Sequence, residues 1–339
     1  MGRPVTDARI LVQALRDPGS TVVLDAAGWS ALLAIARAEQ LIGTLARRLD
    51  GLELPDSVAR QLADARAAAE QGRVAALWEA EMARRALGAT GMPLVLLKGT
   101  AFVAAGLAAG VGRSIGDLDI LVPRARIEEA EVALIAAGWE WVKPDPYDDA
   151  YYRRWMHELP PLIHRERDRM IDVHHTILPL TARIRPDAQA LIEDSRLLEN
   201  GMRILSPNDM LCHAAAHLFA DGNLAGGLRN LWDIHCLIEE FGVEGLLDRA
   251  ARHGLNAAVS RALRLSAELY GTAIPHGGSL RSVADSLYIR RLLARDSWGR
   301  PSRKATRFGF YLRSHLLRMP PAMLARHLWT KWRKGGFPA

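Results

Sequence analysis

The chain has 339 residues, of which 49% are apolar and 24% charged, and its formal net charge is +6. This is enough material for a sizeable core in one large domain or two modest ones. Cys212 and Cys236 are the only cysteines, so no disulfide framework is indicated and a reducing compartment is expected. The sequence shows no signal-peptide core and no apolar run of about 18 residues, so we expect a soluble, cytoplasmic protein without a transmembrane segment.

The positive charge is concentrated at the C-terminal end of the chain. Residues 297–339 contain ten Lys or Arg and no Asp or Glu, so the rest of the chain carries about −4. A basic segment of this kind attracts phosphate, whether in nucleic acid, nucleotide or an anionic membrane.

The first ninety residues predict helices. Apolar residues recur at helical spacing over 30–49, and residues 56–87 are rich in Ala and free of Pro. The segment ATGMP at 89–93 ends this pattern. We therefore expect an N-terminal helical region over residues 1–90.

Between residues 91 and 184 short apolar runs alternate with amphipathic stretches. Strands are predicted over 94–99, 117–122 and 139–142, with two more around the polar turn RERDR inside 158–178. Helices are predicted after the turn KGT and over 124–138. Strands that alternate with helices indicate a small α/β sheet.

After Pro186 the chain reads as helical again. A hairpin with an Asn-Gly turn is predicted over 195–205, followed by helices over 206–220 and 228–242 and further helices to about 295. The predicted organisation is a helical region (1–90), an α/β core (91–184), a helical domain (185–296) and a basic tail (297–339).

Acidic side chains interrupt two of the predicted strands. Asp117 and Asp119 share one face of a strand, and Asp172 and His174 share a face of another. A strand that turns Asp toward solvent would explain each residue, but apolar residues follow Asp119 directly. Like charges this close repel unless a cation lies between them. Mg²⁺ prefers such oxygen ligands, so these residues indicate a metal site.

A turn of small residues precedes the acidic strand. Gly99 allows a close approach of the backbone, and the amides at the start of the next helix would face an anion. Thr100 offers a hydroxyl, while Lys98 and Arg113 bring positive charge near the aspartates in sequence.

These motifs, LLKGTAF…GRSIGDLDILV and the later Asp-x-His strand, resemble the bacterial family of uncharacterised nucleotidyltransferases, within the superfamily of DNA polymerase β. The resemblance extends from about Trp29 to Glu240. It implies an α+β fold, with a small mixed-sheet nucleotidyltransferase core flanked by N- and C-terminal helical regions.

The resemblance also implies an activity and its residues. An enzyme of this kind moves a nucleoside monophosphate from an NTP, which we expect to be ATP, to an acceptor and releases pyrophosphate. Two Mg²⁺ ions, or Mn²⁺ in their place, would be held by the catalytic residues Asp117, Asp119 and Asp172. The nucleotide would be bound by the following residues: Lys98, Gly99, Thr100, Arg113 and His174. His174 would also position Asp172 or contact the acceptor.

Other interpretations remain open. The acceptor could be a small molecule, a peptide or protein, or tRNA. The chain could also be an inactive RNA- or protein-binding adaptor, or a kinase-like enzyme that moves the γ-phosphate.

His213 and His217 suit a core or pocket wall better than zinc, since no Glu follows the first His. Arg229 and Asp233 form either a helix-surface pair or part of the cleft. The basic and aromatic tail suits RNA, an anionic membrane or packing on the body.

Overall fold

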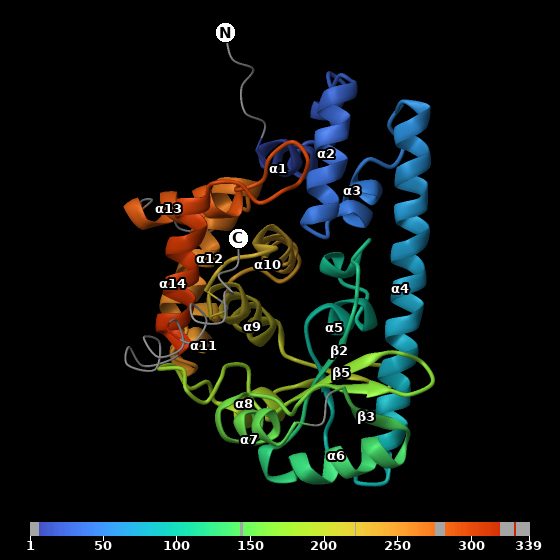
Figure 1. The fold of residues 1–339 in the computed structure, drawn as a ribbon, viewed down its shortest axis with the longest axis vertical. Helices are drawn as coiled ribbons and strands as arrows, with labels where there is room; N and C mark the ends of the chain where they lie inside the picture. The colour runs from blue at the N-terminus through green and yellow to red at the C-terminus, as the bar shows by residue number, and fades with distance from the viewer. Residues whose placement is uncertain (1–6, 143–144, 221, 275–281, 319–328, 330–339) are drawn as a thin grey trace.

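The computed structural model describes residues 7–142, 145–220, 222–274, 282–318 and 329. Most of this chain is helical (Figure 1). The α-helices are α1 (Arg9–Arg16), α2 (Ala26–Ala38), α3 (Ile42–Arg48), α4 (Asp56–Gly88), α5 (Lys98–Ala104), α6 (Ile127–Ala136), α7 (Pro146–Trp155), α8 (Ala188–Glu193), α9 (Pro207–Ala220), α10 (Gly227–Phe241), α11 (Leu246–Arg252), α12 (Asn256–Tyr270), α13 (Val283–Leu292) and α14 (Lys304–Arg318).

One mixed sheet carries the strands, in the order β3-β4-β5-β2-β1-β7-β6. The pairs β2·β5 and β1·β7 are parallel, and the other neighbours are antiparallel. This mixed sheet among helices confirms the predicted α+β fold. The strands are β1 (Val95–Leu96), β2 (Leu118–Leu121), β3 (Trp139–Trp141), β4 (Leu162–His164), β5 (Met170–His174), β6 (Arg196–Leu197) and β7 (Arg203–Ile204).

Several local predictions are confirmed and one is extended. The third strand and the two strands around RERDR form as β3, β4 and β5. The hairpin at 195–205 forms as β6 and β7, and it joins the sheet beside β1, so the sheet continues beyond residue 184. The domain boundaries themselves stay a prediction. Of the basic tail, residues 319–328 and 330–339 lie outside the described residues. Among the described helices, none has the length and apolar character needed to cross a membrane.

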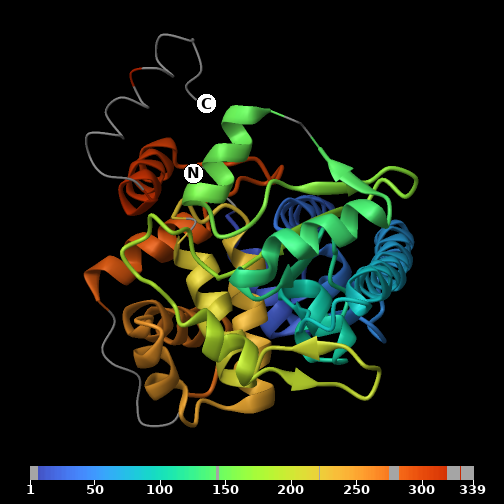
Figure 2. The ribbon, with the colours of Figure 1, turned by 90° about the horizontal axis from the view of Figure 1, so that it is seen from below.

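Helix α4 runs along one side of the molecule (Figure 1) and is seen end-on beside the sheet in Figure 2. Its 33 residues form one uninterrupted helix because the segment is rich in Ala and contains no Pro. It packs against α3, α5 and α6 and also contacts β2, so it connects the N-terminal helices to the sheet.

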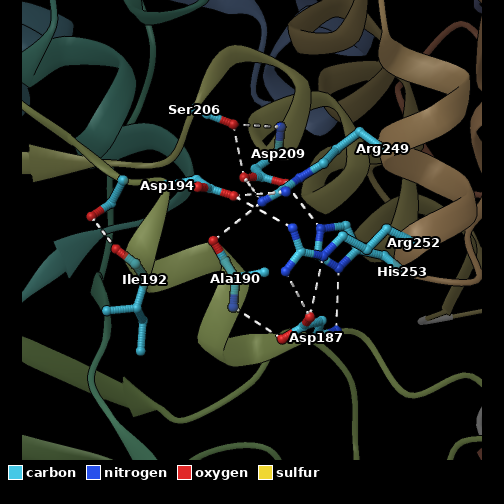
Figure 3. Close-up of polar contacts among 10 residues, drawn as sticks. Asp187, Ala190, Ile192, Asp194, Ser206, Asp209, Arg249, Arg252 and His253 are labelled. Carbon is cyan, nitrogen blue, oxygen red and sulfur yellow. Dashed lines mark hydrogen bonds and ion pairs between the residues drawn. The ribbon is translucent and has the colours of Figure 1, made fainter.

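A buried ionic network ties the segment between β5 and β6 to helices α9 and α11 (Figure 3). Asp209 of α9 is fully buried, and Arg249 of α11 donates to its two oxygens at 2.5 and 2.6 Å. His253 lies 3.0 Å from the same carboxylate, and its other ring nitrogen accepts from the amide of Asp187 before α8. Arg249 also pairs with Asp194 at 2.7 Å. The network therefore fixes α8, α9 and α11 as one unit beside the sheet.

Two glycines allow the N-terminal helices to approach the loop before β2. Gly43 of α3 lies against the backbone of Gly112, and a Cβ at either position would overlap the backbone of the other. Gly112 has φ +65°, a left-handed conformation that suits glycine. The next residue, Thr44, donates its hydroxyl hydrogen to the carbonyl of Val111 at 3.2 Å. The loop that leads to Arg113 is thereby held on α3.

We expect Gly43→Ala to lower the free energy of unfolding by about 1–3 kcal/mol, because the added methyl group must displace the backbone of Gly112. Gly72→Ala in α4 is the matched control. Nothing lies near its Cβ position, so the change should stabilise the helix by about 0.5–1 kcal/mol. Urea unfolding measures both. Equal effects of the two substitutions would contradict the close approach.

Candidate active site

The structure brings together the three aspartates that the sequence singled out. Strands β2 and β5 pair in parallel with Asp119 opposite Asp172, so both side chains lie on one face of the sheet. Asp117 precedes β2 by one residue. One carboxylate oxygen from each of the three lies within 4.8 Å of the others. We call Asp117, Asp119 and Asp172 the aspartate cluster.

The three residues of the aspartate cluster differ in their exposure to solvent. Asp119 is 4% exposed, Asp172 is half-buried and Asp117 is exposed. Beside Asp117, residues Ala75 and Ala76 of α4 form part of a small hollow. A ligand from solvent would therefore meet Asp117 first.

Two basic side chains contact the buried carboxylate of Asp119. Lys98 Nζ donates to Asp119 Oδ1 at 2.6 Å, and His174 Nε2 lies 3.0 Å from the same oxygen. Burial alone would raise the pKa of Asp119, but Lys98 and His174 hold it well below its usual range. Asp119 is therefore ionised, and both contacts fall on one oxygen. The hydrogen bond of His174 goes to Asp119, whereas the sequence predicted a role beside Asp172 or the acceptor.

Lys98 adopts a backbone conformation that is uncommon for its residue type. Its φ is +49°, in the left-handed region, at the junction between β1 and α5. Burial opposes its charge, yet the attraction of Asp119, Asp117 and Asp172 raises its pKa. Strained residues of this kind concentrate at functional sites, where the surrounding structure compensates the cost.

The residues after Lys98 are closely packed. Gly99 lies against the Arg113 side chain, and a Cβ there would overlap the guanidinium Nε. Thr100 is 1% exposed in the first turn of α5. Glycine is required at this position because any larger residue would displace the arginine. The predicted contact of Gly99 and Thr100 with phosphate stays a prediction.

The side chain of Arg113 pairs with a residue of helix α10. Its guanidinium forms an ion pair with Asp233 of α10, and its side chain is only 12% exposed. Arg229, one turn before Asp233, donates to that carboxylate at 2.6 Å and to the Thr44 hydroxyl of α3 at 2.7 Å. The Arg229–Asp233 pair is thus a buried support behind the site, and not an exposed helix-surface pair. The predicted contact of Arg113 with nucleotide stays a prediction.

Helix α9 closes the site on the side of Lys98. Lys98, His213, His217 and Asp233 line a cavity of about 30 Å³, which has room for about one water molecule. Burial lowers the pKa of His213 well below its usual range, so this ring is neutral. His213 and His217 therefore form a wall beside Lys98, as the sequence favoured.

Asp172 has the opposite electrostatic environment to Asp119. Burial, together with the charges of Asp119 and Glu158, raises its pKa to about 7. Without a cation the aspartate cluster therefore holds a proton near neutral pH. A divalent ion would displace that proton and relieve the repulsion.

Glu158 and its neighbour His157 also lie at the site, although no sequence pattern predicted it. They lie between α7 and β4, and Glu158 forms an isolated antiparallel bridge with His174. Burial lowers the pKa of His157 to about 2. The adjacent polar pair in MHELPPL was the only local signal, and nothing in it indicated which strand it would face.

We expect metal to stabilise the protein more at high pH than at low pH. A carboxyl whose pKa rises from 3.8 to about 7 on folding destabilises the metal-free fold as pH rises through that range. Mg²⁺ should therefore raise the melting temperature more at pH 8 than at pH 5, as measured by thermal unfolding. The metal-free Asp172→Asn protein should be more stable than the wild type at pH 8, by on the order of 1–3 kcal/mol. An equal response to Mg²⁺ at both pH values would contradict this assignment.

Substitution of Asp233 tests the support behind the site. Asp233→Asn leaves Arg113 and Arg229 buried without their carboxylate, and we expect it to cost about 3–5 kcal/mol in urea unfolding. The control is Glu70→Gln, which breaks an exposed pair with Arg73 and should change stability very little. A mild effect at Asp233 would show that the network carries little of the stability.

The comparison with protein families agrees with this geometry. Residues 25–271 match the family model described as uncharacterised nucleotidyltransferase. No curated protein matches the chain. The match covers well over half of the chain and includes the sheet, the aspartate cluster and the Arg113–Asp233–Arg229 support. The chain therefore belongs to the uncharacterised nucleotidyltransferase family.

Proposed function

We propose that this protein transfers a nucleoside monophosphate from an NTP to an acceptor and releases pyrophosphate, with a divalent metal held by the aspartate cluster. The observation that carries the proposal is the convergence of Asp117, Asp119 and Asp172 from two parallel strands. The family match supports nucleotidyl transfer in general.

The donor atoms suit magnesium. All three residues of the aspartate cluster offer carboxylate oxygens, the ligands preferred by Mg²⁺ and Mn²⁺. The pKa of Asp172 is raised first by burial and then by the charges of Asp119 and Glu158, and a bound cation would offset both. When bound, two such ions would neutralise charge on the leaving pyrophosphate and make the acceptor a better nucleophile.

In the proposed reaction the acceptor oxygen forms a bond to the α-phosphorus as the bond from that phosphorus to the β-phosphate oxygen breaks. Asp172 is the residue that we assign to hold or accept the acceptor proton. Asp119, kept ionised by Lys98 and His174, stays negative throughout. The ammonium group of Lys98 also offsets charge on the triphosphate.

The remaining predicted residues take supporting roles in this proposal. Gly99, next to Lys98 in the chain, leaves room for the Arg113 side chain, and Thr100 is buried in the first turn of α5. His174 orients Asp119. We propose ATP as the nucleotide, and a hydroxyl, phosphate or side chain of a small molecule, protein or tRNA as the acceptor. The basic tail from residue 297 would favour an acidic acceptor.

Labelled nucleotides test the reaction. The protein is incubated with Mg²⁺, cell extract and each NTP carrying label at either the α- or the γ-phosphate. We expect α-label in a product and γ-label in pyrophosphate. Transfer of γ-label alone would replace this proposal with a kinase-like reaction.

Variants link that activity to the aspartate cluster. Asp117→Asn and Asp119→Asn should each reduce transfer by about 10³-fold or more, since bound metal supplies several kcal/mol of transition-state stabilisation. Asp64→Asn, an exposed carboxylate on α4, should retain full activity. NTP binding measured by calorimetry that is independent of Mg²⁺ and of Asp117 would favour an inactive adaptor.

A further inference from the structure

Two histidines and a glutamate form a second group of possible metal ligands beside the aspartate cluster. His157, Glu158 and His174 each place one donor atom within 4.8 Å of the others. We call them the His–Glu–His cluster. It contains nitrogen donors, unlike the aspartate cluster, and shares no residue with it.

The orientation of His174 leaves one ring nitrogen available. Its Nε2 lies 3.0 Å from Asp119 Oδ1, and an ionised carboxylate can only accept a hydrogen bond, so Nε2 carries the hydrogen. When the imidazole of His174 is neutral, its Nδ1 then carries a lone pair and no hydrogen. This Nδ1 is buried and makes no hydrogen bond within the described chain, although Glu158 Oε2 lies 3.3 Å away. Because it faces a carboxylate oxygen, this Nδ1 is placed to hold a cation, either a proton or a metal ion.

His157 brings a third donor to the same point. Its Nε2 lies 3.5 Å from Glu158 Oε2, and its ring is 5.1 Å from that of His174. The backbone fixes this approach, because the amide of His175 donates to the carbonyl of His157 at 2.9 Å. The side chains of His157 and Glu158 are 21% and 17% exposed, so an ion can enter from solvent.

We propose that His157 Nε2, Glu158 Oε2 and His174 Nδ1 bind one transition-metal ion, best matched by Zn²⁺, at a site separate from the aspartate cluster. Two imidazoles and one carboxylate are a known zinc donor set that leaves one position open. Asp119 is the carboxylate that orients His174 from its other nitrogen, as carboxylates do behind many histidine ligands. Mg²⁺ favours oxygen donors, so the two clusters select different ions.

The test measures zinc binding, and it does not depend on nucleotidyl transfer. Protein stripped of metal by a chelator is dialysed against Zn²⁺ with an excess of Mg²⁺ that occupies the aspartate cluster. We expect one Zn²⁺ for each wild-type chain. X-ray absorption of the zinc-loaded wild-type protein should show two imidazole ligands, and this measurement needs no variant.

Variants locate the ion. His157→Gln and Glu158→Gln should each weaken Zn²⁺ binding by at least about 100-fold, and Asp119→Asn by about 10- to 100-fold. The matched control is His175→Gln, because His175 neighbours the site in sequence but is not part of the His–Glu–His cluster. Asp117→Asn should keep its zinc even where transfer activity is lost.

Three results would overturn the proposal. They are a wild-type chain that binds no zinc, a zinc ion with no imidazole ligand, and zinc that is lost in Asp117→Asn but retained in His157→Gln. The last would place the ion in the aspartate cluster. None of these results bears on nucleotidyl transfer itself, which the labelled nucleotides test separately.

Discussion

The site depends on keeping one buried carboxylate ionised. Asp119 is almost inaccessible to solvent, and burial of a charge costs several kcal/mol unless partners compensate it. Lys98 and His174 supply that compensation on one oxygen. The same region also holds Asp117, Asp172 and Glu158, so the acidic groups outnumber the single lysine. The site therefore carries excess negative charge, which favours the binding of divalent cations.

The position of Lys98 is in turn maintained from distant parts of the chain. Its left-handed backbone is followed by Gly99, which leaves space for the Arg113 side chain. Arg113 contacts Asp233 of α10, and Arg229 extends the network to Thr44 of α3. Helices α3 and α10 thus fix the arginine side chain that lies against Gly99, the residue after Lys98. All residues of this network lie within the family match of residues 25–271.

Sequence patterns predicted the parts of this arrangement that are local. Alternation placed Asp117 and Asp119 on one face of their strand, and Asp172 and His174 on one face of theirs, because strand periodicity depends only on neighbouring residues. The hairpin at β6 and β7 followed from its Asn-Gly turn. Helix α7 was missed because its segment PYDDAYYRRW lacks apolar periodicity.

The contacts between strands were not predictable in this way. Whether His174 would face Asp172 or Asp119 depends on the register of β2 against β5, which no local pattern encodes. Glu158 and His157 reach the site through a backbone bridge to His174, and Arg113 turns away to Asp233 because a helix more than a hundred residues later lies behind it. A single sequence indicates which residue types are present for chemistry, whereas tertiary packing decides which of them contact the reacting groups.

Asp119 connects the aspartate cluster to the His–Glu–His cluster. Its carboxylate belongs to the aspartate cluster and also fixes the ring of His174 in the His–Glu–His cluster. A cation at either place would draw electron density from the same hydrogen-bonded pair, and two cations so close would repel each other unless the intervening carboxylates remain ionised. Asp119 is held in that ionised state before any ion arrives. Its ionisation is therefore the condition under which both clusters could be filled at once, and Lys98 and His174 maintain it.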